Sequence, residues 1–419
     1  NSGLFDASPE AMEKMYFVQD LEVIEFNQLK ERYYEPGLWG KLMGANSEQL
    51  RDVKGLGEIK LSPSINLAIT NETLNVTLED RGGGIGKYMV FINGKEAFSG
   101  NLPEEQINFR GGKTLTNTFN LKNHPYLISG AENDIEVKAY NGENYLVSRG
   151  EKIPYKQEGT LMAEKPRLFI ISSGISDYTG ELLDLKYAAK DADDITGALQ
   201  LGAKRLFGIE STYINKLTTS TSDRTKWPTK QNIKNAFAEV AKQAKSSDIL
   251  VVYLSGHGIN YGGQDGDFYY LTQDAYTNNM DAYNDPGIRN GTTISSAELT
   301  ELIKSVPALK QVLIMDACGS GKAVDNLMAK RDIPSSTLRA LDRMKDRTGL
   351  HIITGCAADA VSYEASRYGQ GVLTYSLLEG MKGASLREEK FVDVNKLFQY
   401  SSERVPQLAK GVGGLQQPQ

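Results

Sequence analysis

The sequence predicts an all-β domain followed by an α/β domain with a mainly parallel sheet flanked by helices. Between about residues 60 and 150, short segments of alternating apolar and polar residues are separated by glycine-containing turns such as "RGGGIG" and "NGEN", a pattern typical of antiparallel strands. From residue 167 onward, apolar strand-like runs alternate with amphipathic helical patterns, which indicates right-handed βαβ units. The chain of 419 residues is long enough for both domains, because single cores rarely grow past about 250 residues.

The expected strands of the first domain have the sequences "IKLSPSINLAI", "TLNVTLED", "KYMVFING", "NTFNLK" and "DIEVKAYN". Their number and spacing predict an immunoglobulin-like β-sandwich over residues 60–150. Residues 1–59 contain a helical pattern and an aromatic-rich stretch without an obvious core, so we interpret them as an extension that packs on a neighbouring domain. Residues 151–166 are polar with a proline towards each end, which suits a linker or an edge segment.

The α/β domain is expected over residues 167–410. Its predicted strands cover residues 167–172, 249–255, 268–272, 311–316 and 350–355, and its predicted helices cover residues 181–200, 230–245, 296–305, 373–381 and 393–405. In an open parallel sheet, functional side chains gather in loops beyond the carboxyl ends of the strands. Two of the predicted strands end there in the unusual sequences "SGHG" and "DACGSG".

Composition narrows the classes of function. The formal net charge of −6 gives none of the basic excess that nucleic-acid binding needs. No apolar run approaches the roughly 18 residues of a membrane span. The chain begins with neither Met nor a signal sequence, so we interpret it as a processed or truncated product. A cytoplasmic location is favoured, without excluding export.

The two unusual strand ends contain the residue types of a cysteine nucleophile. Such a nucleophile needs an imidazole to handle its proton and backbone N–H groups directed at the developing oxyanion. His257 and Cys318 follow two predicted strands and have glycine neighbours that allow close backbone approach. Taken alone, a tight turn would explain this histidine, and core packing would explain this cysteine. Their matching positions favour a catalytic dyad, whereas Cys356, His351 and His124 have no comparable partner.

The motifs "YLSGHG" and "IMDACGSG" resemble those of caspase-like cysteine peptidases. The resemblance is to the metacaspase and orthocaspase branch, in which Asp-x-Cys replaces the Gln-Ala-Cys of animal caspases. It extends over about residues 167–405 and includes "GISDY", "LKYAAKDADDI", "YLTQDAY" and "GVLTYSLLEGM". The whole chain also resembles bacterial proteins in which such a domain follows WD40 repeats. A WD40 region, absent from this sequence, is therefore an expected upstream partner.

The resemblance implies a caspase-like fold and a mechanism without a metal cofactor. Cys318 would attack a peptide carbonyl, and His257 would assist proton transfer to the leaving amine. The N–H groups of Gly258 and Cys318 would form the oxyanion hole. The expected partners are protein or peptide substrates. The alternative is a catalytically silent caspase-like scaffold or interaction protein.

The resemblance also implies a pocket for Arg or Lys before the scissile bond. Its expected lining is the carboxylates of Asp191, Asp274 and Asp316 and the hydroxyl of Ser255. A partly buried carboxylate cluster is costly unless a cation arrives, which makes the cluster selective for basic side chains. The alternative for Asp191 is a solvated helix face, because two further aspartates follow it closely.

Two weaker hypotheses concern processing and calcium. The segment 322–347 is rich in basic residues and includes Lys330 and Arg331, where a basic-specific peptidase could cut itself; an ordinary solvated helix over "STLRALDRMKDR" explains the composition equally. The stretch "GGQDGDFYY" offers Asp265 and Asp267 as calcium ligands. It lacks the spacing of an EF-hand loop, and a β-turn explains it at least as well.

Overall fold

The computed structural model describes residues 2–100, 114–157, 165–263, 266–319, 334–355, 364–365, 367–388, 391–411, 416 and 418, without the side chains of residues 318, 319, 364, 365 and 387. The chain divides into two compact units, Asn1–Ala163 and Glu164–Gln419. Across the described ranges, every helix is too short or too polar to span a bilayer.

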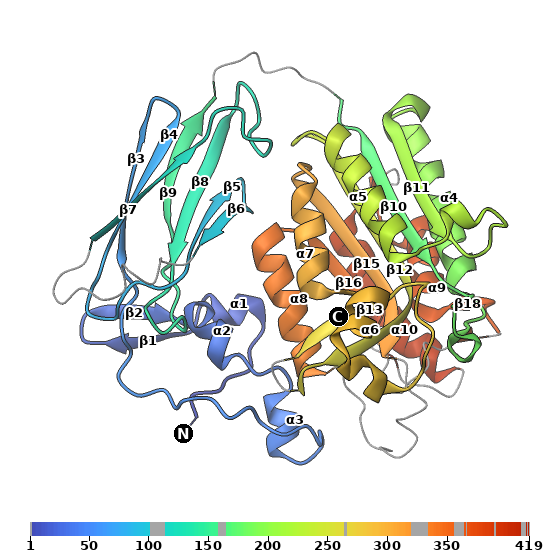
Figure 1. Cartoon of the computed structure of the whole chain (residues 1–419), viewed down its shortest axis with the longest axis horizontal. Helices are drawn as coiled ribbons and strands as arrows, with labels where there is room; N and C mark the ends of the chain where they lie inside the picture. Colours follow the sequence, from blue (N-terminus) through green and yellow to red (C-terminus); the bar gives the residue numbers. More distant parts are fainter. Residues whose placement is uncertain are drawn as a thin grey trace. The chain divides into compact units, whose positions relative to one another are not determined.

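The two larger antiparallel sheets described in the first unit have the strand orders β3-β4-β7 and β6-β5-β8-β9 (Figure 1). The strands are β3 (Ser64–Thr70), β4 (Thr73–Glu79), β5 (Tyr88–Ile92), β6 (Lys95–Gly100), β7 (Thr114–Asn120), β8 (Glu132–Ala139) and β9 (Glu151–Lys156). Alternating burial along β4 and β8 matches the period of two expected for strands with one apolar face. The antiparallel strand structure is confirmed, and the immunoglobulin-like arrangement stays a prediction.

Residues 151–156 form the edge strand β9 beside β8, so the alternative of an edge segment holds for them and the linker does not. Ile153 pairs with Ile135 there, and the ring of Tyr155 is buried. Pro154 has no N–H to donate, and an edge strand tolerates this because one of its sides has no partner strand. The few apolar residues of this stretch therefore suffice for a strand.

The residues before the two sheets form short elements. These are α1 (Pro9–Met12), β1 (Tyr16–Gln19), β2 (Glu22–Glu25), η1 (Phe26–Leu29), α2 (Lys30–Tyr33) and α3 (Leu38–Leu42). Leu29 and Tyr33 share an apolar cluster with Tyr145 and Leu146, which follow β8. This extension therefore packs on the sheet region of its own unit.

The second unit is built on a seven-stranded sheet whose parallel core has the order β11-β10-β12-β15-β16. Its strands are β10 (Leu168–Gly174), β11 (Thr212–Thr218), β12 (Ile249–Tyr261), β13 (Asp267–Leu271), β14 (Thr293–Ser295), β15 (Lys310–Gly319) and β16 (His351–Thr354). The last four residues of β12 also pair antiparallel with β13. The predicted parallel sheet is confirmed.

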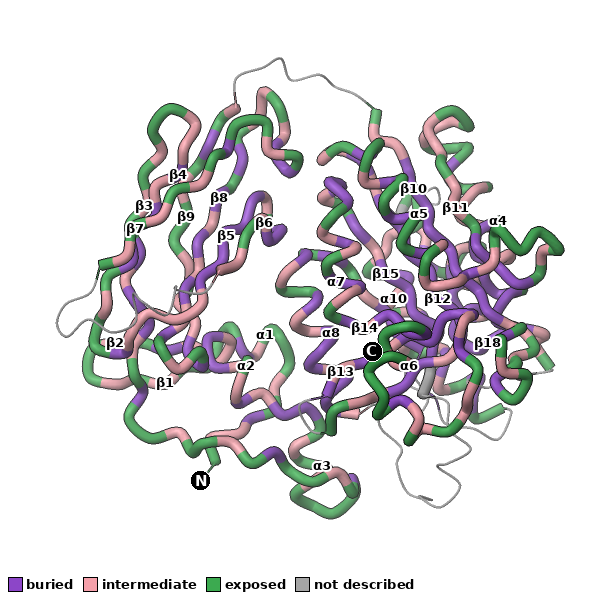
Figure 2. Tube along the Cα trace, in the orientation of Figure 1, coloured by how far each residue is buried: buried purple, intermediate pink, exposed green. Residues whose placement is uncertain are grey.

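Helices cover both faces of this sheet (Figure 1). They are α4 (Ala188–Leu206), α5 (Lys230–Gln243), α6 (Pro286–Thr292), α7 (Ser296–Ser305), α8 (Ser335–Thr348), α9 (Val372–Glu379) and α10 (Val394–Lys410). Leu313 and Met315 of β15 pack in one apolar cluster with α5, α7 and α8, whereas Ile314 packs in a second with α4, α9 and α10. Figure 2 shows the central strands as the most buried part of this unit. The sheet therefore holds the ends of its strands on a rigid, two-sided core.

Two local predictions in this unit differ from the structure. The helix expected over residues 181–200 begins only at Ala188, because residues 181–183 form a 3-10 turn and the N–H of Leu185 donates to the carbonyl of Ser176. The solvated helix considered within 322–347 is α8, but Arg339 and Met344 on it are buried. Lys330 and Arg331 lie outside the described residues.

Candidate active site

Parallel pairing of β12 with β15 places the two predicted catalytic positions side by side. Their registers match Ser255 with Asp316 and His257 with Cys318. Neighbouring strands lie about 4.8 Å apart, so the backbones at positions 257 and 318 are adjacent at the carboxyl end of the sheet. For Cys318 the structure describes the backbone alone.

The His257 imidazole is held by the loop that follows β10. Its Nε2 lies 2.8 Å from the carbonyl oxygen of Leu183. Its ring stacks on that of Tyr178, with centroids 5.2 Å apart and planes at 29°. The backbone N–H of His257 donates to the Tyr178 hydroxyl oxygen at 2.8 Å. Burial lowers the pKa of His257 to about 4, with the Leu183 carbonyl acting in the opposite direction.

These contacts assign the protons of the imidazole at neutral pH. A carbonyl oxygen only accepts, so Nε2 carries the proton that goes to Leu183. Because the pKa of His257 is near 4, the ring carries only this one proton at neutral pH and has no net charge. Nδ1 is therefore the basic nitrogen. The site therefore contains an unprotonated nitrogen that can accept a proton from a nucleophile.

Steric crowding explains why both neighbours of His257 in the sequence are glycines. Gly256 has φ +154°, and a Cβ atom on it would lie 2.7 Å from the Tyr178 hydroxyl oxygen. A Cβ atom on Gly258 would overlap the ring of Phe268. Aromatic rings thus fill the space that side chains at these two positions would need, and the strand end accepts only glycine there.

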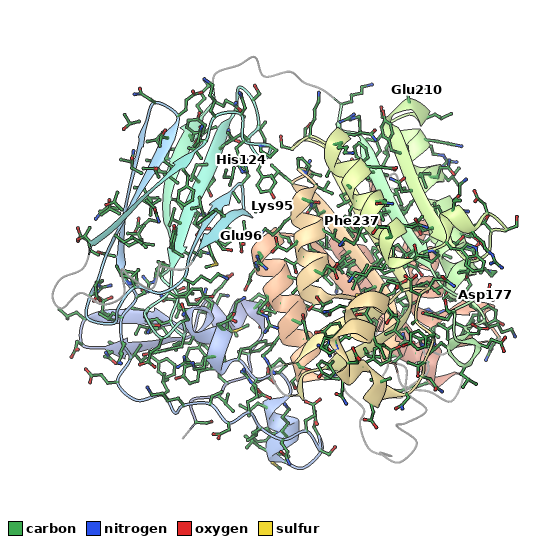
Figure 3. The ribbon with its side chains drawn as sticks, in the orientation of Figure 1. Lys95, Glu96, His124, Asp177, Glu210 and Phe237 are labelled. Atoms are coloured by element: carbon green, nitrogen blue, oxygen red, sulfur yellow. The ribbon has the colours of Figure 1, made fainter. Side chains whose placement is uncertain are left out.

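The loop that holds His257 is restrained by hydrogen bonds within itself and to the residues that follow β13. In Figure 3, the label of Asp177 marks this loop at the right-hand side, below the label of Glu210, which precedes β11. The N–H of Tyr178 donates to Asp184 Oδ1 at 2.9 Å. The N–H of Thr179 donates to the carbonyl of Gln273 at 3.0 Å. Such tethering fixes the Leu183 carbonyl that His257 uses.

Two of the predicted pocket carboxylates converge. Asp191 on α4 and Asp316 on β15 are each 2% exposed. The N–H of Gly371 donates to Asp191 Oδ2 at 3.0 Å, and the Thr374 hydroxyl donates to Asp316 Oδ2 at 2.9 Å. A Cβ atom on Gly371 would lie 2.8 Å from both of these Oδ2 atoms. The alternative of a solvated Asp191 is therefore wrong.

The electrostatics of this acidic pair are unbalanced. Burial, followed by the charge of Asp316, raises the pKa of Asp191 to about 8. Burial raises the pKa of Asp316 to about 6, although the hydrogen bond from Thr374 lowers it. Asp316 Oδ1 is buried without a hydrogen-bond partner among the described residues. Ionising both carboxyl groups is unfavourable unless a cation neutralises them.

The other two predicted pocket residues differ in their surroundings. Ser255 is 2% exposed and is the register partner of Asp316, so it adjoins the acidic pair. Asp274 instead accepts from the N–H of Lys230 at 2.7 Å and from the Thr272 hydroxyl at 3.0 Å. These contacts place its carboxylate at the N-terminus of α5, where the helix dipole favours a negative charge. The described hydrogen bonds do not join it to Asp191 or Asp316.

The candidate calcium ligands have other partners or lie outside the description. Asp267 accepts hydrogen bonds from the Ser296 hydroxyl and from the N–H of Ala297 at the start of α7. Asp265 is not among the described residues. Within those residues, no three acidic, histidine or cysteine side chains gather as a metal site would require.

The site also contains residues that sequence reasoning missed. Leu183, Gly371 and Thr374 contact the predicted functional residues, and so does Tyr178 of the quoted motif "GISDY". Leu183 acts through its carbonyl and Gly371 through its N–H, so their side chains carry no signal for these contacts. The motif "GISDY" contributes to the family resemblance, but it predicts no individual role for Tyr178.

Comparisons with known proteins agree with this arrangement. A family model described as Caspase domain matches residues 168–419. Metacaspase-4 of Arabidopsis thaliana is 32% identical over 118 residues, which cover 28% of this chain and 26% of that protein. Metacaspase-2 of the same plant is 23% identical over 254 residues, covering 53% of this chain and 55% of its own length. The chain thus spans between about a quarter and about half of these relatives.

A crystal structure of a Geobacter sulfurreducens protein covers 61% of this chain and 92% of its own, with 17% identity and a TM-score of 0.37. The family match includes both strand ends of the site and more than half of the residues. The chain therefore belongs to the caspase domain family, with metacaspases among its relatives.

Proposed function

We propose that this protein is an endopeptidase that uses His257 and Cys318 as a catalytic dyad and cleaves peptide bonds after Arg or Lys. The observation that carries the specificity is the convergence of Asp191 and Asp316, two buried carboxylates that meet beside Gly371. Asp316 precedes Cys318 by two residues on one strand, so a substrate held at one position reaches the other.

The proposed chemistry follows from the protonation of His257. Nδ1 accepts the proton of the Cys318 thiol, and the sulfur forms a bond to the carbonyl carbon of the substrate. N–H groups of Gly258 and Cys318 stabilise the oxyanion. His257 then gives its proton to the leaving amine, and the C–N bond breaks to leave a thioester. Water hydrolyses the thioester with His257 as base, which restores the thiol.

The proposed pocket selects its substrate by charge. The guanidinium of Arg or the ammonium of Lys supplies the cation that Asp191 and Asp316 lack, and donates to the unpartnered Asp316 Oδ1. An Asp side chain would bring a further negative charge to this buried acidic pair. A neutral side chain would leave the pair without compensation.

Fluorogenic peptides ending in Arg, Lys, citrulline or Asp test the proposal in the wild type and in two cysteine variants. We expect hydrolysis after Arg and Lys, loss of activity in Cys318→Ala and normal activity in the matched control Cys356→Ala. Faster hydrolysis after Asp than after Arg would overturn the specificity. Silence of the wild type with every peptide would favour the alternative of a catalytically silent scaffold.

Calcium activation and self-processing are two further proposals for the same protein. Assays with added calcium and with a chelator test the first. For the second, we propose cleavage at Lys330 or Arg331, which intact-mass measurement after incubation would detect. Cys318→Ala should remain uncut unless wild-type enzyme is added. An active wild type of unchanged mass would count against self-processing.

A further inference from the structure

Tyr178 makes two different contacts with His257, one through its ring and one through its hydroxyl. We propose that Tyr178 is a positioning residue that fixes the orientation of the His257 imidazole for the reaction. The inference rests on the proposed dyad, but its central measurement does not require peptidase activity.

The hydroxyl contact restrains the backbone before the imidazole. Gly256 has no Cβ atom, so its own conformational preferences hold the strand end only weakly. The Tyr178 oxygen accepts from the N–H of His257, on one side of Gly256. On the other side, the Tyr270 hydroxyl donates to the carbonyl of Ser255 at 3.0 Å. The two phenols thus hold the peptide groups that flank the flexible residue.

The ring contact restrains the imidazole itself. Tyr178 is 6% exposed and belongs to the main apolar cluster, so its ring is fixed by packing. It covers one face of the imidazole, while the Leu183 carbonyl holds Nε2 at the ring edge. Together these contacts occupy Nε2 and keep water from one face of the ring, and the described residues give Nδ1 no hydrogen-bond partner.

Among the described residues, burial outweighs charge in the surroundings of Tyr178 and His257. Around Tyr178, the titratable groups are Asp184 on its own loop, Tyr270 on β13, Tyr283 and His257. Among the described groups, burial dominates the pKa of His257, and no carboxylate contributes. Without the ring of Tyr178, water would reach the imidazole and its pKa would move up towards 6.5.

Two substitutions separate the contacts. Tyr178→Phe keeps the ring and removes the acceptor of the His257 N–H, and we expect kcat to fall about tenfold. Tyr178→Leu removes both contacts, with an expected loss in kcat of about a hundredfold. KM for Arg peptides should change by less than about twofold, because the acidic pair does not contact Tyr178. The matched control is Tyr283→Phe, whose hydroxyl donates to the Thr277 carbonyl without contacting His257.

NMR of protein with labelled histidine provides the test independent of catalysis. His124→Gln and His351→Gln variants assign the signals. In the wild type, His257 should be neutral with its proton on Nε2 down to about pH 5. In Tyr178→Leu its pKa should rise by at least one unit and both neutral tautomers should appear. Identical His257 signals in the two proteins would overturn the proposal.

The NMR and kinetic results separate this inference from the proposed function. If Tyr178→Leu changes the tautomer while the wild type cleaves no peptide, Tyr178 positions His257 and the endopeptidase proposal fails. If the wild type cleaves Arg peptides and Tyr178→Leu retains full kcat, the positioning role is refuted and the endopeptidase proposal stands. Normal folding of each variant is checked by its thermal unfolding midpoint.

Discussion

Replacing Asp316 with Asn isolates the contribution of charge in the proposed pocket, because the side chain keeps its shape. A cation about 4 Å from a carboxylate gains about 4 kcal/mol at an effective dielectric constant of about 20. At about 1.4 kcal/mol per factor of ten, this corresponds to about a thousandfold. The charge of Asp316 also raises the pKa of Asp191, so Asp191 ionises more readily in the variant and restores part of the attraction. We therefore expect a loss of about a hundredfold.

The quantity to measure is the ratio of kcat/KM for an Arg peptide to that for the same peptide with citrulline. Citrulline has nearly the shape of Arg without its charge, so the ratio cancels general damage to the enzyme. Asp274→Asn is the matched control, because the Asp274 carboxylate contacts the start of α5. An unchanged ratio in Asp316→Asn, or an equal fall in Asp274→Asn, would refute the reasoning.

Four further predictions concern the acidic pair and the dyad. The folded pKa of Asp191, about 8, exceeds the unfolded value of 3.8, so unfolding releases a proton above pH 4 and stability falls as pH rises. Near pH 7 the free energy of unfolding should fall by about 1.4 kcal/mol per pH unit from this group. Urea unfolding at pH 7 and pH 8 should show a smaller fall in Asp191→Asn than in the wild type. For His257 the pH dependence has the opposite sign, because its folded pKa of about 4 lies below the ordinary value of 6.5. Its contribution to stability is lost as pH falls from 6.5 to 4, so the free energy of unfolding of His257→Gln should fall less between these two pH values. Binding of an Arg peptide to Cys318→Ala at pH 7 should release up to about one proton, measured by calorimetry in buffers of different ionisation enthalpy; no release would contradict a protonated empty pocket. Gly371→Ala should abolish hydrolysis after Arg, since its Cβ would lie 2.8 Å from both carboxylates; unchanged kcat/KM would place the cation elsewhere.

Parts of the site could be predicted because they follow from strand geometry. Parallel strands bring their carboxyl ends to one edge of the sheet, so the sequence alone predicts that "SGHG" and "DACGSG" are neighbours. The family resemblance implied that Asp191 lines a partly buried pocket, but the helix pattern alone left this open, because Asp193 and Asp194 follow it and the sequence does not say which of them faces inward. Packing of α4 against the sheet decides that orientation.

Other parts depended on tertiary contacts without a sequence signal. The spacing of Leu182, Leu183 and Leu185 is typical of a helix, yet the backbone there forms a 3-10 turn followed by a loop. In this conformation the Leu183 carbonyl accepts a hydrogen bond from His257. The strand β11 has the polar sequence "TYINKLT" and was missed, because an edge strand needs fewer apolar residues than a central one. Asp274 lies in a motif expected at the pocket, but the structure places its carboxylate at a helix terminus.

The register of β12 with β15 fixes the distance between two pairs of residues. Ser255 pairs with Asp316, and His257 pairs with Cys318 two residues further along the strands. Because a parallel strand advances about 3.3 Å per residue, the two pairs lie about 6.6 Å apart. The sheet fixes this spacing, so the proposed pocket stays at a constant distance from the proposed dyad. Side chains at Asp316, or at Asp191 on α4, could therefore change without moving His257 or Cys318.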